Sequence, residues 1–117
     1  MILADTSVWI DHFRRGNPTL GALLAKGRIV CHPFIVGELA LGNLRNRAEI
    51  LTHLKRLPQL LVASHDEVLA FVERRRLSGL DIGWVDVHLL AAALLAGARL
   101  WALDARLARV ARRVRVG

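Results

Sequence analysis

Short apolar runs alternate along this chain with segments in which apolar residues recur every three or four positions. The runs at 1–4, 28–31, 60–63 and 99–103 predict buried β-strands, and the run at 114–116 predicts a short edge strand. Helical patterns fall between them, at 7–15, 19–26, 33–41, 46–56, the residues after 64, 85–96 and 105–112. Strands that alternate with helices indicate an α/β fold with a parallel sheet and helices on both faces.

Four carboxylates occupy comparable places in this pattern. Asp5 ends the first strand and Asp104 follows the strand at 99–103, while Glu38 and Asp86 lie in the helices at 33–41 and 85–96. Each has a structural interpretation taken singly: Asp5 and Asp104 as helix N-caps, and Asp86 as a favourable charge at a helix N-terminus. Glu38 lies inside its helix, where capping does not explain it.

Taken together, the four carboxylates predict a cluster at one sheet edge, because ligands in such folds bind outside the carboxyl ends of the strands. Two carboxylates about 4 Å apart repel by about 4 kcal/mol at an effective dielectric constant of 20. The cluster therefore requires a positive partner, either Arg or a divalent cation. An all-oxygen site suits Mg²⁺ or Mn²⁺ better than zinc.

The charge balance points to a polyanionic partner. The chain carries 17 Lys and Arg against 10 Asp and Glu, a formal net charge of +7, and only Lys26 and Lys55 of the cations are not Arg. Five arginines and no acid fall within 105–117. Arg binds phosphate through its planar fork, so this excess favours contact with nucleic acid, although codon bias toward Arg also explains the identity of the cations.

Length and composition bound the remaining classes. With 117 residues and 54% hydrophobic residues, we expect one packed domain over 1–117. The single Cys31 excludes an internal disulfide and is interpreted as a buried core residue. The start lacks a signal-peptide pattern, and the apolar run at 89–98 is shorter than the roughly 20 residues that span a bilayer. We therefore expect a cytoplasmic protein with no membrane partner.

Four stretches carry a family resemblance. ILADTSVWID, PFIVGELALGNL, IGWVDVHLLAAA and LWALDARL resemble, in order and spacing, the acidic motifs of PIN-domain proteins, and most of all those of the VapC toxins of bacterial toxin–antitoxin modules. The resemblance implies a three-layer α/β/α sandwich with a central parallel sheet. It also implies a Mg²⁺- or Mn²⁺-dependent endoribonuclease. In the implied reaction the 3′ oxygen of the RNA phosphodiester is the leaving group, so that the product carries a 5′ phosphate.

The same resemblance implies roles for the acidic residues and for partners. Asp5 and Asp86 would hold the principal metal, and Glu38 and Asp104 would bind a second metal, or the first through water. A VapB-like antitoxin would block the site, and both a homodimer and a toxin–antitoxin heterocomplex are implied, with RNA as the substrate.

Two other hypotheses remain. A PIN-fold module that binds RNA or protein without cutting is the main alternative to the nuclease. An aspartate-based phosphotransfer domain is disfavoured, because Asp5 is not followed by a second acid and neither lysine is suitably placed.

Several residues near the predicted site have two interpretations each. Ser7 is a helix cap or a donor to a carboxylate, and Asp81 is a turn residue or a neighbour of the site. His88 is a packing residue, Trp84 packs or stacks on a base, and Arg47 contacts RNA phosphates or is solvated.

Overall fold

The sheet at the centre of the molecule has three parallel strands. The computed structural model describes residues 1–117, with β1 at Ile2–Ala4, β2 at Ile29–Val30 and β3 at Arg99–Trp101. The strand order is β2-β1-β3, and Leu3 of β1 is in register with Val30 on one side and Leu100 on the other. The earliest strand is therefore central, and both of its neighbours join it through helical crossovers.

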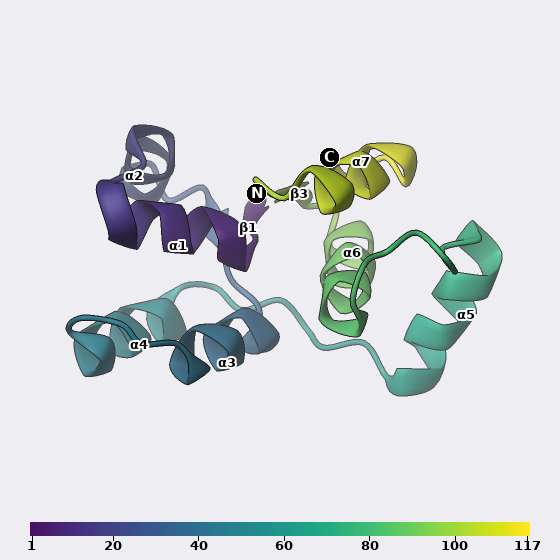
Figure 1. Ribbon diagram of the computed structural model, residues 1–117, viewed down its shortest axis with the longest axis horizontal. Helices are drawn as coiled ribbons and strands as arrows, with labels where there is room; N and C mark the ends of the chain where they lie inside the picture. The colour runs from purple at the N-terminus through teal and green to yellow at the C-terminus, as the bar shows by residue number, and fades with distance from the viewer.

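Seven helices surround this sheet. They are α1 (Thr6–Arg15), α2 (Pro18–Ala25), α3 (Pro33–Leu41), α4 (Arg47–Arg56), α5 (His65–Arg75), α6 (Trp84–Ala96) and α7 (Ala105–Arg113). α1 contacts β1, α6 and α7 contact β3, and α3 lies beside α4 (Figure 1). None of the seven is both long enough and apolar enough to cross a membrane. The predicted α/β/α class with a parallel sheet is confirmed.

The core follows from the apolar runs of the sequence. The interior side chains Leu3, Ile35 and Leu89 are fully buried. α6 contributes seven consecutive buried residues, from Val87 to Ala93, which explains why its sequence is apolar on nearly every side. Burial of this helix against β3 and α5 fixes where its first turn meets the edge of the sheet.

The predicted strand at 60–63 is not formed. Only one isolated parallel bridge, between Cys31 and Gln59, extends the sheet there, with Leu60 N–H donating to the Cys31 carbonyl at 2.9 Å. Leu60 and Ala63 are buried while Leu61 is 89% exposed, so the buried positions are three residues apart. A strand needs a spacing of two, and the segment turns away from the sheet after one bridge.

The predicted edge strand at 114–116 is also wrong. Leu100 N–H donates to the Val116 carbonyl at 2.7 Å, but the C-terminal residues form no strand. Val114 and Val116 are buried and Arg115 has φ +64°. The left-handed residue breaks the extended backbone that a ladder requires.

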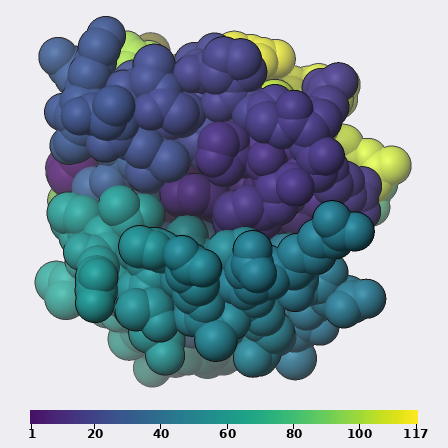
Figure 2. Space-filling model, turned by 90° about the vertical axis from the view of Figure 1, so that its left-hand side faces the viewer, coloured from purple at the N-terminus to yellow at the C-terminus, as the bar shows by residue number.

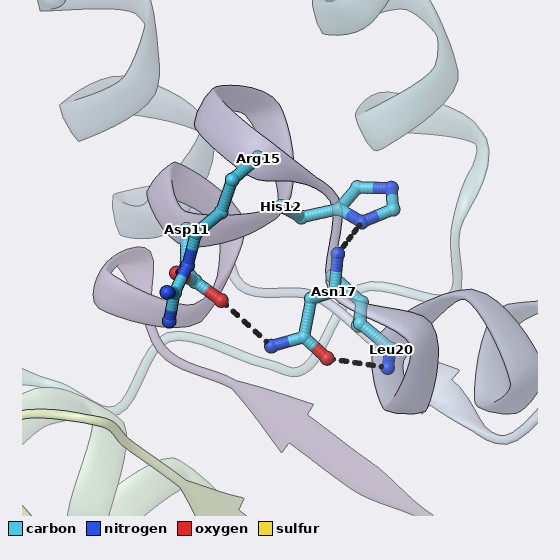
Figure 3. A network of polar contacts seen from close by, with 5 residues as sticks. All are labelled: Asp11, His12, Arg15, Asn17 and Leu20. Atoms are coloured by element: carbon cyan, nitrogen blue, oxygen red, sulfur yellow. Dashed lines mark hydrogen bonds and ion pairs between the residues drawn. The ribbon is translucent and has the colours of Figure 1, made fainter.

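A polar network makes the corner between α1 and α2. The Asn17 side chain caps α2 by accepting from Leu20 N–H at 3.0 Å, and its amide donates to Asp11 at 3.0 Å (Figure 3). Asn17 N–H donates to His12 Nδ1 at 3.1 Å. Asp11 also pairs with Arg15 one turn further along α1, so the negative charge at this corner has a cationic partner.

Candidate functional site

Helix N-termini gather at the carboxyl edge of the sheet. Asp5 is the N-cap of α1 directly after β1, and its carboxylate accepts from Ser7 N–H at 3.1 Å and from Ser7 Oγ at 2.7 Å. Asp104 is the N-cap of α7, accepting from the backbone N–H groups of Arg106 at 2.9 Å and Leu107 at 3.1 Å. The capping interpretation of both residues is confirmed. Capping also directs both carboxylates toward the same edge, since the strands that precede them are parallel.

The two hydroxyl residues after Asp5 each hold a carboxylate. Thr6 Oγ1 donates to Glu38 Oε1 at 2.8 Å, which joins α1 to α3 across 32 residues. Ser7 Oγ, besides donating to Asp5, accepts from Leu103 N–H at 3.0 Å and so ties α1 to the segment after β3. The prediction that Ser7 donates to a carboxylate is confirmed, and Asp5 is the residue that caps the helix.

Asp86 reaches this edge from the first turn of α6. Its carboxylate accepts from Gly83 N–H at 3.1 Å, which closes the start of the helix. The loop before it turns at Gly79, with φ +74°, and at Asp81, with φ +60°. Glycine adopts such angles freely, and aspartate tolerates them better than most residues.

These carboxylates lie close enough for their charges to influence one another's pKa. Partial burial of its carboxylate raises the pKa of Glu38, although the residue as a whole is exposed, and the negative charges of Asp5 and Asp86 add to the rise, against the opposing hydrogen bond from Thr6. Burial likewise raises the pKa of Asp86, opposed by the Gly83 N–H and reinforced by Asp5 and Asp104. All four predicted site residues therefore belong to one interacting cluster.

No side-chain cation neutralises this cluster. The three ion pairs of the chain join Arg15 to Asp11, His53 to Glu49 and Arg106 to Asp81, and none includes a site carboxylate. Of the two positive partners that the sequence left open, Arg is thus not supplied by this chain.

The donor set fits a hard divalent cation in kind, although the side chains are not arranged as a finished site. All four groups offer carboxylate oxygen, which Mg²⁺ and Mn²⁺ prefer. In the present arrangement no three His, Cys, Asp or Glu side chains converge closely enough to hold an ion. Each carboxylate accepts a hydrogen bond of its own, from Ser7, Thr6, Gly83 or the α7 backbone.

Two charged residues near the predicted site, Asp81 and Arg47, make structural contacts. Asp81 forms an exposed ion pair with Arg106 at 2.6 Å, and its charge is not among those that raise the pKa of Glu38 or of Asp86. The Arg47 guanidinium donates to the Ala40 carbonyl at 3.0 and 2.8 Å, where it caps α3. Sequence reasoning missed this cap because the two residues meet only through the turn between α3 and α4.

An aromatic series runs from the interior to the surface beside the cluster. His32 contacts Phe34, which contacts His88, which in turn meets Trp84, with ring centroids 5.0, 4.8 and 5.1 Å apart. His88 is buried, in agreement with its predicted packing role, whereas Trp84 is 40% exposed. Cys31 is fully buried, and burial raises the pKa of its thiol to about 11, as expected of a core residue and not of a nucleophile.

A hollow adjoins the acidic cluster on the side of α1 and α4. Its volume is about 660 Å³, and Glu38 lies at its wall together with Phe13, Asn43 and Arg45. A second hollow of about 470 Å³ lies between α4 and the helices α1 and α2, and its lining includes Trp9, Leu24 and Leu54. Figure 2 views this side of the molecule, where the atoms of α1 and α2 meet those of α4 along a seam.

Comparison with known proteins agrees with the fold. The PIN-domain family model matches residues 2–113, and the chain belongs to the PIN-domain family. Within that family it is a chain of the VapC group. Two proteins named Ribonuclease VapC32, from Mycobacterium tuberculosis strains CDC 1551 / Oshkosh and ATCC 25618 / H37Rv, are each 50% identical to it over 108 residues. The match covers 92% of this chain and 87% of each relative.

Proposed function

We propose that this chain is a Mg²⁺- or Mn²⁺-dependent endoribonuclease and the toxin of a toxin–antitoxin module. The observation that carries the proposal is the cluster of Asp5, Glu38, Asp86 and Asp104, in which burial and then the neighbouring carboxylates raise the pKa of Glu38 and of Asp86, with no cationic side chain to offset them. The relatives named as ribonucleases support the same reading.

The roles proposed for the chain's own groups follow from their hydrogen bonds. Asp5 and Asp86 would be the principal metal ligands, because Asp5 is buried and Asp86 half-buried at this edge, and a backbone N–H nearby holds each carboxylate. Glu38 and Asp104 are exposed and would complete the site or orient the attacking water. When bound, Mg²⁺ or Mn²⁺ supplies Lewis acidity toward a phosphodiester and lowers the pKa of water.

Thr6 and Ser7 would position these carboxylates. Each hydroxyl donates to one carboxylate oxygen, at 2.8 Å to Glu38 and 2.7 Å to Asp5, and leaves the second oxygen free. A hydrogen bond of this kind fixes the rotamer of a ligand before a cation arrives, in the way that outer-shell partners tune other metal sites.

The deciding experiment is cleavage of end-labelled structured RNAs by the protein freed of any antitoxin. Reactions with Mg²⁺, with Mn²⁺ and with EDTA are run beside the Asp5→Asn variant. Asn caps a helix about as well as Asp, so the fold should be retained and only the ligand charge lost. We expect cuts that need the metal and disappear in the variant.

The opposite result has a defined meaning. Absence of cleavage on every RNA by a folded protein that binds Mg²⁺ would favour the alternative, a PIN-fold module that binds RNA or protein without cutting. Cleavage that survives EDTA and Asp5→Asn would overturn the metal-site mechanism.

The proposed partners have separate tests. Expression of the chain should arrest growth of a bacterial host, and coexpression of a VapB-like antitoxin should restore it. Light scattering of the purified chain should give the mass of a homodimer, and the mass of a heterocomplex when the antitoxin is present. A cytoplasmic location is part of the same proposal, because RNA and the antitoxin are met there.

A further inference from the structure

The surface of α7 carries an unusual concentration of positive charge next to the acidic edge. Leu107, Val110 and Ala111 face the core. Arginines occupy the outer face of the helix and the turn after it, and all five are exposed: Arg106, Arg109, Arg112, Arg113 and Arg115. No acid lies between 105 and 117, so the chain supplies no local counter-charge on this helix.

Two of these arginines have structural partners. Arg106 pairs with Asp81 at 2.6 Å, and Arg113 Nη2 donates at 3.2 Å to the carbonyls of both Arg75 and Arg76. The connector from the end of α5 toward α6 is therefore attached to α7 at both ends. Because this connector leads to Asp86, its contacts with α7 hold the basic helix in a fixed position relative to the acidic cluster.

The other arginines are free. Arg109 and Arg112 form no hydrogen bond through their side chains and no ion pair, and they lie one turn apart on α7. Exposed cations with no partner repel one another and lower the stability of the folded chain. An arrangement that costs stability in the free protein is explained if a polyanion binds there.

We propose that the outer face of α7 binds the phosphate backbone of RNA as the strand leaves the acidic cluster, with Arg109 and Arg112 each contacting a phosphate. This inference rests on the proposed function, since it takes RNA as the substrate. Asp104 caps the same helix, and eight residues separate it from Arg112, which at 1.5 Å per residue is about 12 Å. The free arginines thus lie close enough to the acidic cluster to contact phosphates of the same RNA strand.

The makeup of this face favours nucleic acid over a protein partner. Protein interfaces have an apolar core with aromatic or aliphatic anchors. None of the exposed large apolar side chains of the molecule lies on α7; they are Met1, Leu41, Leu61, Val62, Leu69, Trp84, Leu95 and Leu103. A face of arginines separated by alanines instead offers planar donors for phosphate.

The test compares two double variants with the same change in charge. One is Arg109→Gln with Arg112→Gln. The control is Lys26→Gln with Arg28→Gln, both exposed residues at the amino end of β2, on the opposite edge of the sheet from the carboxylates. Both are made in the Asp5→Asn background with Mg²⁺ present, so that a fluorescein-labelled single-stranded RNA of mixed sequence stays intact. Fluorescence anisotropy gives Kd at several KCl concentrations.

The expected result is a smaller salt dependence in the α7 variant alone. Each phosphate contact to a single strand contributes about 0.7 to the slope of log K against log salt, so two lost contacts should reduce the slope by about 1.4. The control should keep the slope of the parent. Neither variant should unfold at a lower temperature than the parent, because the substituted side chains are exposed and have no partner to lose, and the α7 variant should gain whatever stability the arginine repulsion costs.

Two outcomes would overturn the proposal. An unchanged slope in the α7 variant would mean that this face does not contact RNA phosphates, and would favour an acidic protein as its partner. Equal losses in both variants would mean that only net charge matters. Neither outcome depends on whether the wild-type chain cleaves RNA. If the slope falls in the α7 variant but the wild-type chain cleaves no RNA, RNA binding by α7 is retained and the proposed nuclease activity is overturned.

Discussion

The corner between α1 and α2 and the carboxyl edge of the sheet both contain aspartate, but its charge is stabilised at the corner and left without a cation at the edge. At the corner, Asp11 accepts from the Arg15 guanidinium and from the Asn17 amide, and the Arg15 hydrogen bond lowers the pKa of Asp11. At the edge, burial and neighbouring carboxylates raise the pKa of Glu38 and of Asp86.

The difference separates an acid that supports the fold from acids that a function must explain. A carboxylate with a cation and an amide within hydrogen-bond distance stabilises the structure around it. A cluster of carboxylates without a cation destabilises the free protein, and folding alone gives no reason to keep it. We infer that the edge of the sheet, and not the corner, is where a ligand of positive charge binds.

The largest effect should come from exchanging one aspartate in each region for asparagine. Asp86→Asn should lower the rate of RNA cleavage by more than about 100-fold, because even outer-shell partners of metal ligands cost 10- to 100-fold. Asp11→Asn removes the same charge far from the edge and should leave the rate within about twofold of wild type. Single-turnover cleavage of a labelled RNA measures both.

Stability should change in the opposite sense for the same two variants. Urea unfolding at pH 7 should show Asp11→Asn less stable than wild type, because the Arg15 partner is lost, and Asp86→Asn no less stable. If Asp86→Asn cleaved normally, or if both variants lost activity equally, the distinction between the two regions would be wrong.

The pH dependence of folding stability should report on a third place, the buried His32. Burial, reinforced by the charge of His88, lowers the pKa of His32 from 6.5 to about 4. The folded protein keeps this imidazole neutral while the unfolded chain protonates it, so the unfolded state binds more protons and stability falls as the pH drops from about 6.5 to 4. The full loss is about 3 kcal/mol.

The matched variant for this measurement is His32→Asn. His32 caps α3 by accepting from Phe34 N–H at 2.9 Å, and asparagine is also a good N-cap that does not titrate in this range. Urea unfolding between pH 7 and pH 4 should therefore show a flatter pH dependence in the variant. Equal slopes in the two proteins would assign the acid sensitivity to other groups.

Added Mg²⁺ should stabilise the protein through the edge and not through the corner. A ligand that binds only the folded state adds about 2.7 kcal/mol when its free concentration is 100 times Kd. We expect this gain in wild type and in Asp11→Asn, measured by urea unfolding at increasing Mg²⁺, and no gain in Asp86→Asn. A gain of the same size in all three proteins would place the cation elsewhere.

The smallest effect should come from the hydroxyl that holds Glu38. Thr6→Val keeps the shape of the side chain and removes the donor, which should cost about 1 kcal/mol in the barrier, or about fivefold in the cleavage rate. Thr6→Ser keeps the donor and should cleave at close to the wild-type rate. Equal rates for Val and Ser would show that the contact to Glu38 is not used.

Local patterns were sufficient to predict the helices. The Ser64 cap with Glu67 three residues later, Pro33 in the first turn of α3 and Gly97 after α6 fall where the sequence suggests, because capping depends on residues within one turn. The two wrong strands have a different cause. A strand depends on a distant partner, and neither 60–63 nor 114–116 finds a continuous one.

The acidic cluster was also predictable as a set, since the parallel sheet brings the ends of β1 and β3 to one edge. The sequence by itself thus determined the helices, three of the strands and the sheet class, and it predicted which carboxylates belong to one edge of the sheet. Only the tertiary structure decided their partners: Thr6 with Glu38, Ser7 with Leu103, Arg106 with Asp81 and Arg113 with the end of α5. These contacts join residues 25 to 96 positions apart. Periodicity reports only on the near neighbours of a residue, whereas pairing at such separations depends on how the helices pack across the sheet.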